Sequence, residues 1–441
     1  GLSWGASNAY DNYYLAAPYL DMLRKGEAST ATLDDKARRV LRLIFRTAMN
    51  SQKPFGSLNS PEHLAAARRI AGEGMVLLKN DLGKARTIAV VGENAVKMMT
   101  VGGGSSSLKV RHEYTPLEGI RAAVDDKAEV IYERGYVGDV TGNYNGVKTG
   151  QDLSESRSEE QLIADAVAAA RKADAVIFVG GLNKSQHQDC EGSDRLQYGL
   201  PYAQDRVIEA LAEANPNLAV VIVSGNAVAM PWIGRVPAVL EAWFSGSEAG
   251  NALADVVFGA VNPSGKLPFT FPVRLEDNSA HALGEYPGTD KVTYNEGIFV
   301  GYRWHDKEQL KPLFAFGHGL SYTTFDIANV KADRSTLSGK GRIRISADVT
   351  NTGSRPGAEV VQLYIGDEQS SLPRPVKELK GFRKISLNPG QTQTVTFDIT
   401  PDMLQYYDAA KGAWVAEPGT FTAYVGAASD NIRGTAGFEL K

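Results

Sequence analysis

Residues 175–201 read AVIFVGGLNKSQHQDCEGSDRLQYGLP, and the rest of the chain is organised around this stretch. It begins with an apolar run, 175–179, followed by two glycines; such a run is typical of a strand buried on both faces of a sheet. It ends at Pro201, a residue that suits the first position of a helix. Apolar residues then recur at helical spacing, at Val207, Ile208 and Leu211. The stretch therefore predicts the strand, loop and helix of an α/β unit.

The loop of this unit is long and polar. Connections between a strand and a helix in α/β units usually take about 2–6 residues. This one is several times longer, and it contains two acids, a histidine, the single cysteine of the chain and an Asp-Arg pair. Loops of that length are commonly functional, and open α/β sheets bind ligands beyond the carboxyl ends of their strands. We predict an active-site loop with Glu191 as its working residue.

The composition is ordinary for a globular protein and excludes several classes of function. A chain of 441 residues predicts about three domains. The net charge of -4 and the pI of about 6.0 give no reason to expect nucleic acid as a partner. No apolar run approaches the roughly 20 residues that span a bilayer, so we expect no membrane span. One cysteine excludes an internal disulfide framework. The first residue is Gly1 rather than Met, and we expect the chain to be part of a longer polypeptide.

Residues 1–50 contain one predicted helix, and residues 51–60 read as a linker. Thr32 is expected to cap the helix, with Asp34 and Asp35 in its first turn. Its apolar residues follow helical spacing at Leu33, Ala37, Val40, Leu41, Ile44, Phe45 and Ala48. A single helix cannot form a domain, so this piece should pack on an upstream segment or on the next domain.

Strands and helices alternate over residues 61–272. The strand patterns lie at 87–91, 129–132, 175–179 and 218–223. The helical patterns lie at 158–172, 201–214 and 247–258, and a further helix is expected to begin at Pro61. Apolar strands separated by helices predict an α/β sandwich domain with a mostly parallel sheet covered on both faces.

The remainder of the chain changes character twice. Residues 273–320 are rich in Gly, Pro and aromatics, and we expect an ordered connecting segment wedged between domains by its aromatic rings. Residues 321–441 show alternating apolar and polar residues, clearest at 342–349, 393–399 and 420–425, with turn residues between them. Short strands without helices predict a small antiparallel β-sandwich of the fibronectin-III type.

Glu191 can catalyse proton transfer near neutral pH only in suitable surroundings. A catalytic carboxylic acid needs a raised pKa, which burial under a ligand or a partner domain supplies. Gly192 lets the backbone approach closely, and Asp194 and Arg195 can form an ion pair that fixes the loop. The residues alone leave open the alternative, a loop glutamate exposed to water.

Three other kinds of site find little support. His187, Asp189 and Cys190 lie too close together and offer too few ligands for a closed zinc site, so we expect no metal. Cys190 lacks the spaced His and Asn that would indicate a nucleophile. Gly92 and the glycine-rich residues 102–106 do not have the spacing of nucleotide-binding loops, so we expect no nucleotide or other cofactor.

A series of motifs resembles family 3 of the glycoside hydrolases, of the β-glucosidase type. The loop carries E-G-x-D-R at residues 191–195. The other matching segments follow in the family's order over essentially the whole chain: 215–217 (NPN), 229–232 (AMPW), 241–246 (EAWFSG), 250–255 (GNALAD), 262–268 (NPSGKLP), 295–297 (NEG), 300–303 (VGYR) and 316–322 (FGHGLSY). Their number and order make the resemblance specific.

The resemblance implies a fold and a divided active site. The fold would be the C-terminal remnant of a (β/α)₈ barrel over residues 1–50, an α/β sandwich and a fibronectin-III-like domain. Glu191 matches the family's acid/base glutamate. The family's nucleophile is an aspartate in an S-D-W motif on the barrel, and Ser3-Trp4 has no such aspartate. A glycosidase needs two carboxyl groups, and no second one is obvious in this chain. We expect the nucleophile in an upstream barrel of the same protein.

The implied activity is the hydrolysis of β-D-glucosides or related β-glycosides from the non-reducing end, with retention of configuration. This chain alone is expected to be inactive, because it lacks a nucleophile. Two alternatives stay open: a non-catalytic carbohydrate-binding or interaction protein derived from the fold, and a β-xylosidase of the same family. Members of the family are usually periplasmic or secreted, which implies the same location here.

Overall fold

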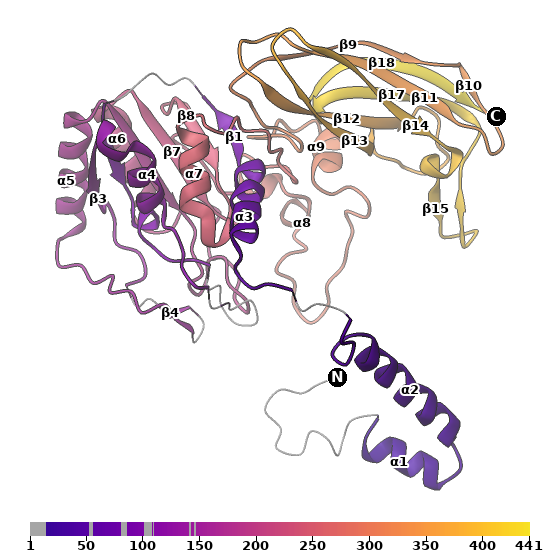
Figure 1. Cartoon of the computed structure of the whole chain (residues 1–441). Helices are drawn as coiled ribbons and strands as arrows, with labels where there is room; N and C mark the ends of the chain where they lie inside the picture. Colours follow the sequence, from indigo (N-terminus) through magenta and orange to yellow (C-terminus); the bar gives the residue numbers. More distant parts are fainter. Residues whose placement is uncertain are drawn as a thin grey trace. The chain divides into compact units, whose positions relative to one another are not determined.

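A computed structural model describes residues 15–52, 56–80, 86–100, 108, 110–140, 143–144 and 147–441. The chain forms two compact units, Gly1–Ser60 and Pro61–Lys441. In the first unit the structure describes two helices, α1 (Ala17–Arg24) and α2 (Thr30–Arg46), drawn in indigo in Figure 1. That these helices belong to a barrel stays a prediction.

The start of α2 differs from the prediction. The helix is capped by Ser29, whose side chain accepts a hydrogen bond from the Thr32 backbone N–H at 3.4 Å. Thr32 therefore lies inside the first turn, and the first turn contains no acidic residue. The predicted cap at Thr32 was wrong because Ser29 already satisfies a backbone N–H that the turn leaves unpaired.

The second unit contains a six-stranded sheet, visible in Figure 1, with strand order β1-β8-β7-β6-β2-β3. Neighbouring strands run parallel except β1, which is antiparallel to β8. The strands are β1 (Val76–Lys79), β2 (Thr87–Val91), β3 (Glu129–Glu133), β6 (Ala175–Gly181), β7 (Leu218–Val223) and β8 (Ala238–Glu241). The mostly parallel sheet predicted from the sequence is confirmed.

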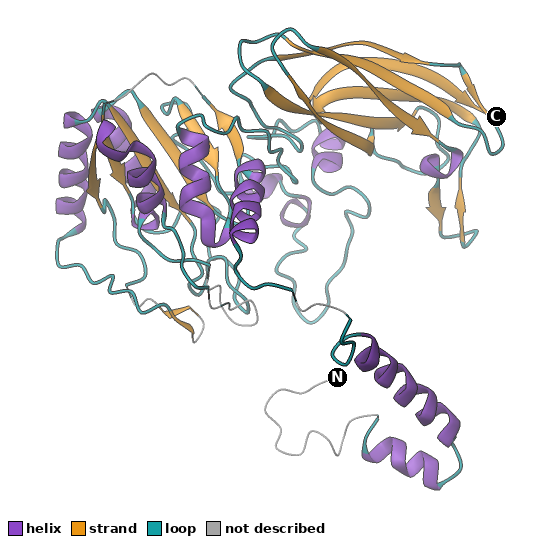
Figure 2. Ribbon diagram, in the orientation of Figure 1, coloured by secondary structure: helices purple, strands orange, loops and turns teal. Residues whose placement is uncertain are grey.

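Helices cover both faces of this sheet (Figure 2). They are α3 (Pro61–Gly74), α4 (Pro116–Val124), α5 (Glu159–Lys172), α6 (Gln204–Ala214) and α7 (Ala249–Val257). The sequence of β6 is continuously apolar because both of its faces are buried. Val176 and Phe178 belong to the core packed under α5 and α6. The alternate residues Ile177 and Val179 belong to the core under α4 and α7. Side chains of a strand alternate between faces, so both faces of β6 are buried.

The helix after the long loop starts later than predicted. Residues Val207, Ile208 and Leu211 are fully buried, as the helical spacing indicated. However, α6 begins at Gln204 rather than at Pro201, because Tyr202 has a φ of 62°, outside the helical region. The buried Gln204 side chain accepts from Gly181 N at 2.7 Å and donates to Gly181 O at 2.8 Å, which joins the helix to the end of β6.

The C-terminal part is a β-sandwich. A five-stranded sheet has the order β10-β18-β17-β12-β13, and a three-stranded sheet the order β14-β11-β9. Their inner faces share one core, and the predicted sandwich is confirmed. The strands are β9 (Phe325–Ala332), β10 (Thr336–Leu337), β11 (Ile343–Asn351), β12 (Gly357–Asp367), β13 (Glu378–Leu387), β14 (Thr392–Ile399), β17 (Gly419–Ala428) and β18 (Asn431–Leu440). A hairpin of β15 (Tyr406–Asp408) and β16 (Ala413–Val415) lies between β14 and β17 in the sequence.

The segment between sheet domain and sandwich is ordered and holds two short helices, α8 (Ser279–Ala282) and α9 (Tyr302–Glu308). Tyr302 stacks on Phe316, and its hydroxyl accepts a hydrogen bond from Leu379 N at 2.9 Å. An ion pair of 2.7 Å between Lys266 and Glu359 also links the two parts. Among the described residues, no helix is both long and apolar enough to cross a membrane.

Candidate active site

The candidate site lies where the parallel strands end. Strand β6 continues into the long loop, residues 182–203, and β7 continues into the turn Ser224–Asn226. Strand β8 is followed by Ala242–Ser245, and β2 by the 3₁₀ turn Glu93–Ala95. Because these strands are parallel, all four connections leave the same edge of the sheet, where ligands bind in open α/β folds.

The first half of the long loop is held by its own hydrogen bonds. The Asn183 side chain accepts from Ser185 N at 2.7 Å, and Asn183 N donates to the Gln188 side chain at 2.9 Å. The Asp189 backbone N–H donates to Asn183 O at 3.0 Å. His187 N donates to the Ser193 hydroxyl at 2.9 Å, which closes the tip. The loop is therefore a folded structure rather than an open excursion of the chain.

The two acids that come first in this loop have different surroundings. The half-buried Asp189 turns back to the sheet, where its Oδ2 accepts a hydrogen bond from Gly225 N at 2.6 Å. Glu191, two residues on, is exposed at the turn that includes Gly192, whose φ is 88°. Glu191 thus has the accessibility that a residue reacting with a bound molecule requires. Its role as the acid/base stays a prediction.

Asp194 and Arg195 each contact a different part of the molecule. The ion pair predicted between these two described residues does not form. Arg195 donates to Ala227 O at 2.7 Å and to Tyr198 O at 2.8 Å. Burial lowers the pKa of this guanidinium. The Asp194 carboxylate instead accepts a hydrogen bond from the hydroxyl of Tyr286. The prediction failed because neither partner could be recognised from the local sequence.

Two cavities lie beside the loop. One, of about 590 Å³, is lined by the loop residues on either side of Glu191 and Gly192, namely 188–190 and 193–198, together with Lys184, Gly225, Asn226, Leu275, His281 and Tyr286. The other, of about 690 Å³, extends from Arg195 toward Tyr302 and Arg303. Five residues line both cavities, so the two cavities form one continuous groove; these residues are Arg195, Tyr198, Asn226, Leu275 and His281.

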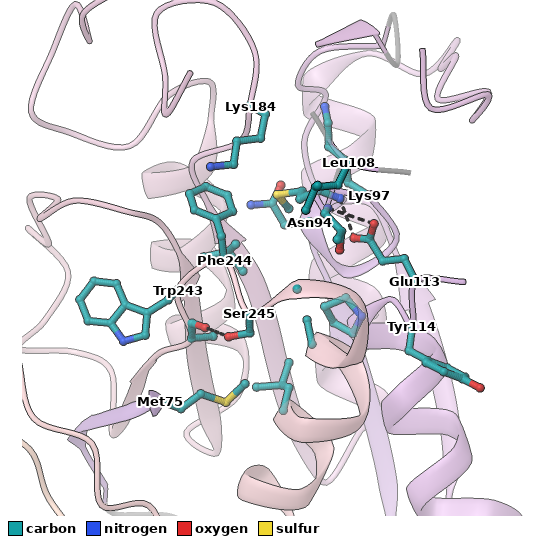
Figure 3. Close-up of a pocket in the computed structure, with 18 residues that line it drawn as sticks. Met75, Asn94, Lys97, Leu108, Glu113, Tyr114, Lys184, Trp243, Phe244 and Ser245 are labelled. Carbon is teal, nitrogen blue, oxygen red and sulfur yellow. Dashed lines mark hydrogen bonds between the residues drawn. The ribbon is translucent and has the colours of Figure 1, made fainter. Parts of the chain in front are cut away.

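A smaller cavity of about 250 Å³ lies at the same edge of the sheet (Figure 3). The Lys184 ammonium lies 3.5 Å from the centre of the Phe244 ring, and burial lowers its pKa against the opposing charge of Asp189. Across the cavity lies Glu113, whose pKa is raised by burial although its carboxylate accepts backbone hydrogen bonds from Met99 and Thr100. Lys184 also lines the groove beside the loop.

Behind the groove the scaffold contains a buried carboxyl group, that of Glu241, which begins the EAWFSG motif but was given no role from the sequence. Glu241, at the end of β8, is fully buried, and burial raises the pKa of its carboxyl well above the ordinary value. Its Oε1 lies 3.2 Å from the Ser224 hydroxyl and accepts from Trp243 N at 3.1 Å. In the sequence, Glu241 stands out only as an acidic residue at the end of an apolar strand. Its contact with Ser224, in the turn after β7, is visible only in the fold.

The residues considered for a metal have other partners. His187 Nδ1 lies 3.1 Å from Asp194 O, and Cys190 Sγ lies 3.2 Å from the Ser193 hydroxyl. Asp189 binds Gly225. No group of three or more His, Cys, Asp or Glu side chains within the described residues is arranged to hold a metal ion. The glycine-rich residues 102–106 and the Ser3-Trp4 segment lie outside the described residues.

Comparison with known proteins decides the family. Residues 75–322 match the model of the glycosyl hydrolase family 3 C-terminal domain, and residues 359–429 match that of the fibronectin type III-like domain. The chain belongs to glycosyl hydrolase family 3. The resemblance stated from its motifs is therefore confirmed, as is the combination of an α/β domain with a fibronectin-III-like domain.

Similar proteins in this family are longer than the chain. A β-glucosidase of Bacteroides ovatus is 49% identical over all of this chain, which spans 60% of that protein. A periplasmic β-glucosidase of Salmonella typhimurium is 35% identical over 98% of this chain, which spans 58% of it. The crystal structure of a Bifidobacterium adolescentis family 3 β-glucosidase matches 97% of this chain with a TM-score of 0.84 and 32% identity; 60% of that structure is covered.

Proposed function

We propose that this chain is the C-terminal part of a retaining, exo-acting β-glucosidase in which Glu191 is the acid/base. The observation that carries the proposal is the position of Glu191: it is exposed on an overlong loop at the carboxyl edge of the sheet, and its loop neighbours Cys190 and Ser193 line a cavity of about 590 Å³. The relatives named as β-glucosidases support this substrate class over a β-xyloside. They also favour an enzyme over a non-catalytic binding protein.

In this mechanism the reaction proceeds in two steps. An aspartate upstream of this chain attacks the anomeric carbon, the bond to the leaving oxygen breaks, and Glu191 gives its proton to that oxygen. Glu191 then removes a proton from water, which attacks the anomeric carbon and releases the aspartate. Two displacements at the same carbon retain its configuration. The chain alone should not hydrolyse glycosides, since it lacks the residue that attacks.

The first unit fits the proposed barrel. Its helix α2 exposes apolar side chains in the structure, among them Leu43 at 63% and Phe45 at 59%. An amphipathic helix gains stability by burying such a face, and the upstream barrel would supply the covering surface. The substrate would be a β-linked glycoside, with no role for nucleic acid. The name of the Salmonella relative supports a periplasmic or secreted location.

Substitution of Glu191 tests the role of the carboxyl group. In the full-length protein, Glu191→Gln should lower kcat for an unactivated β-glucoside by about 10²–10⁴-fold, the range that general acid–base catalysis contributes. With a dinitrophenyl glucoside, whose leaving group needs no proton, the glycosyl-enzyme should accumulate. Azide should then attack the anomeric carbon, release the aspartate and restore turnover, giving the β-glucosyl azide.

A matched control separates this effect from general disturbance. Glu213 is an exposed glutamate on α6, and Glu213→Gln should leave both substrates unaffected. Full activity of Glu191→Gln on unactivated glucosides would remove Glu191 from the mechanism. Hydrolysis of an aryl β-glucoside by this chain alone would contradict the proposal that the nucleophile lies upstream.

A further inference from the structure

We propose that Asp189 is the positioning residue for Glu191: its carboxylate ties the active-site loop to the turn after β7 and so fixes where the acid/base is presented. This inference rests on the proposed role of Glu191. Asp189 does not act on the substrate in this account. It acts through the placement of the residue two positions further along the loop.

The first step of the argument is the contact itself. Asp189 Oδ2 accepts a hydrogen bond from Gly225 N at 2.6 Å, and Oδ1 lies 3.4 Å from the Asn226 side-chain nitrogen. A hydrogen bond from a backbone N–H to a carboxylate is charge-assisted and among the stronger kinds. Two residues of chain span at most about 7 Å, so the position of Asp189 closely limits that of Glu191.

The second step is the rigidity of the anchor. Gly225 follows Ser224, which is fully buried and whose hydroxyl lies 2.8 Å from Asn226 O and 3.2 Å from the buried Glu241. Strand β7 is buried along most of its length on both faces of the sheet. A Cβ added at Gly225 would meet Asp189 Oδ2 at 3.4 Å and Phe244 at 3.6 Å, so the three groups are closely packed. The loop is thus tied to a fixed part of the scaffold.

The third step compares Asp189 with the other ties of the loop. Ser185 donates to Asp139, and Arg195 donates to Ala227 O at 2.7 Å. These two contacts tie the loop to other connections on either side of Glu191. The hydrogen bond from Gln188 to the Tyr202 hydroxyl at 2.7 Å and the contacts of Cys190 and His187 with Ser193 are internal to the loop. The contact of Asp189 with Gly225 lies two residues from Glu191, whereas the contact of Arg195 with Ala227 lies four residues away.

Kinetics of the full-length protein test this role. Asp189→Ala should lower kcat for an unactivated β-glucoside by about 10–100-fold with little change in KM, the size of loss that a displacement of about 1 Å can cause. Azide should partly restore turnover of a dinitrophenyl glucoside, as for Glu191→Gln. Asp189→Asn, which keeps an oxygen acceptor for Gly225 N, should recover most of the activity.

Asp174 provides a matched control. It is another aspartate of the same domain whose carboxylate accepts backbone hydrogen bonds, here from Arg86 and Thr87 at 2.8 Å each, and it precedes β6 rather than following it. Asp174→Ala should leave the leaving-group dependence and the azide response unchanged. Hydrogen exchange should show faster exchange over residues 186–196 in Asp189→Ala and slow exchange there in Asp174→Ala.

The outcomes are distinguishable. If Glu191→Gln loses activity and responds to azide while Asp189→Ala behaves as wild type, the positioning role is wrong and the proposed function stands. If Asp189→Ala loses activity equally on all substrates without an azide response, its role is structural only, which also overturns the inference. If Glu191→Gln is fully active, the proposed function itself fails.

Discussion

The two edges of the six-stranded sheet use polar side chains differently. At the edge where strands begin, connections are short and polar groups close turns: Asp174 accepts from two backbone N–H groups, and Asn215 donates to Ala170 O and Ala173 O at 2.8 Å each. At the edge where strands end, the loop from 182 to 203 presents Glu191 to solvent beside a groove. The two edges thus differ in where a carboxylate is placed: in a closed turn at one edge, and on an exposed loop beside a groove at the other.

The largest expected effect comes from removing the polar loop at one edge while keeping the sheet. Replacing residues 186–194 by a Gly-Ser segment of equal length deletes Glu191 and Asp189 together. In the full-length protein we expect kcat/KM for an aryl β-glucoside to fall about a thousandfold or more, because both the acid/base and its placement are lost. Steady-state kinetics measure this. Activity within tenfold of wild type would place the chemistry elsewhere.

A substitution in the core between the two edges should lower the stability of the fold rather than remove a catalytic group. Phe178, in the middle of β6, is fully buried in the core under α5 and α6. Phe178→Ala should lower the free energy of unfolding by about 3–5 kcal/mol, through lost burial and the cavity left behind. Urea unfolding followed by circular dichroism measures this loss. A loss well below this range would mean that the core at β6 can collapse around the cavity.

The buried Glu241 supports the edge where strands end, and its effect on stability should depend on pH differently from that of an exposed acid. Burial raises the pKa of this carboxyl, so the folded state binds more protons than the unfolded state above the unfolded pKa. The free energy of unfolding should then fall as pH rises from the unfolded pKa through the folded one. Glu241→Gln should lack this decrease and be within about 1 kcal/mol of wild type at pH 5. Parallel curves of stability against pH for the two proteins would refute this interpretation.

The smallest effect is expected for Asp174, at the edge where strands begin. Backbone hydrogen bonds from Thr87 and Arg86 lower the pKa of its exposed carboxyl. A lowered pKa contributes stability above the unfolded pKa, and this contribution is lost as pH falls through the folded value. Asp174→Ala should therefore slightly lower the urea midpoint at pH 7. The difference from wild type should shrink as pH falls below the ordinary value of 3.8. A difference that persists there would mean that the charge is not its source.

Much of the fold could be predicted because short stretches of sequence determine where individual strands and helices form. The run 175–179 is apolar throughout since β6 is buried on both faces, and Pro61 begins α3 as expected. The strands β1 and β8 are only four residues long and carry too little pattern to be recognised. The start of α6 was misplaced because the positive φ of Tyr202 depends on the turn around it.

The site could be predicted only in part, for a physical reason. The length and polarity of the loop pointed to Glu191, but the contacts that hold the loop are made to residues distant in sequence. Asp189 binds Gly225, which belongs to another strand's connection, and Asp194 binds Tyr286. Such partners become visible only when the fold brings them together. Local sequence favoured a pair between Asp194 and Arg195 that does not form.

The most direct test of the account is the distance between two carboxyl groups in a crystal structure of the full-length protein. In a retaining glycosidase the acid/base and the nucleophile stand about 5–5.5 Å apart. We expect the Glu191 carboxyl to lie at that distance from an aspartate of the upstream barrel, with Asp189 still bound to Gly225. A Glu191 carboxyl more than about 10 Å from any carboxylate of the barrel would contradict the account, since no retaining mechanism spans that gap.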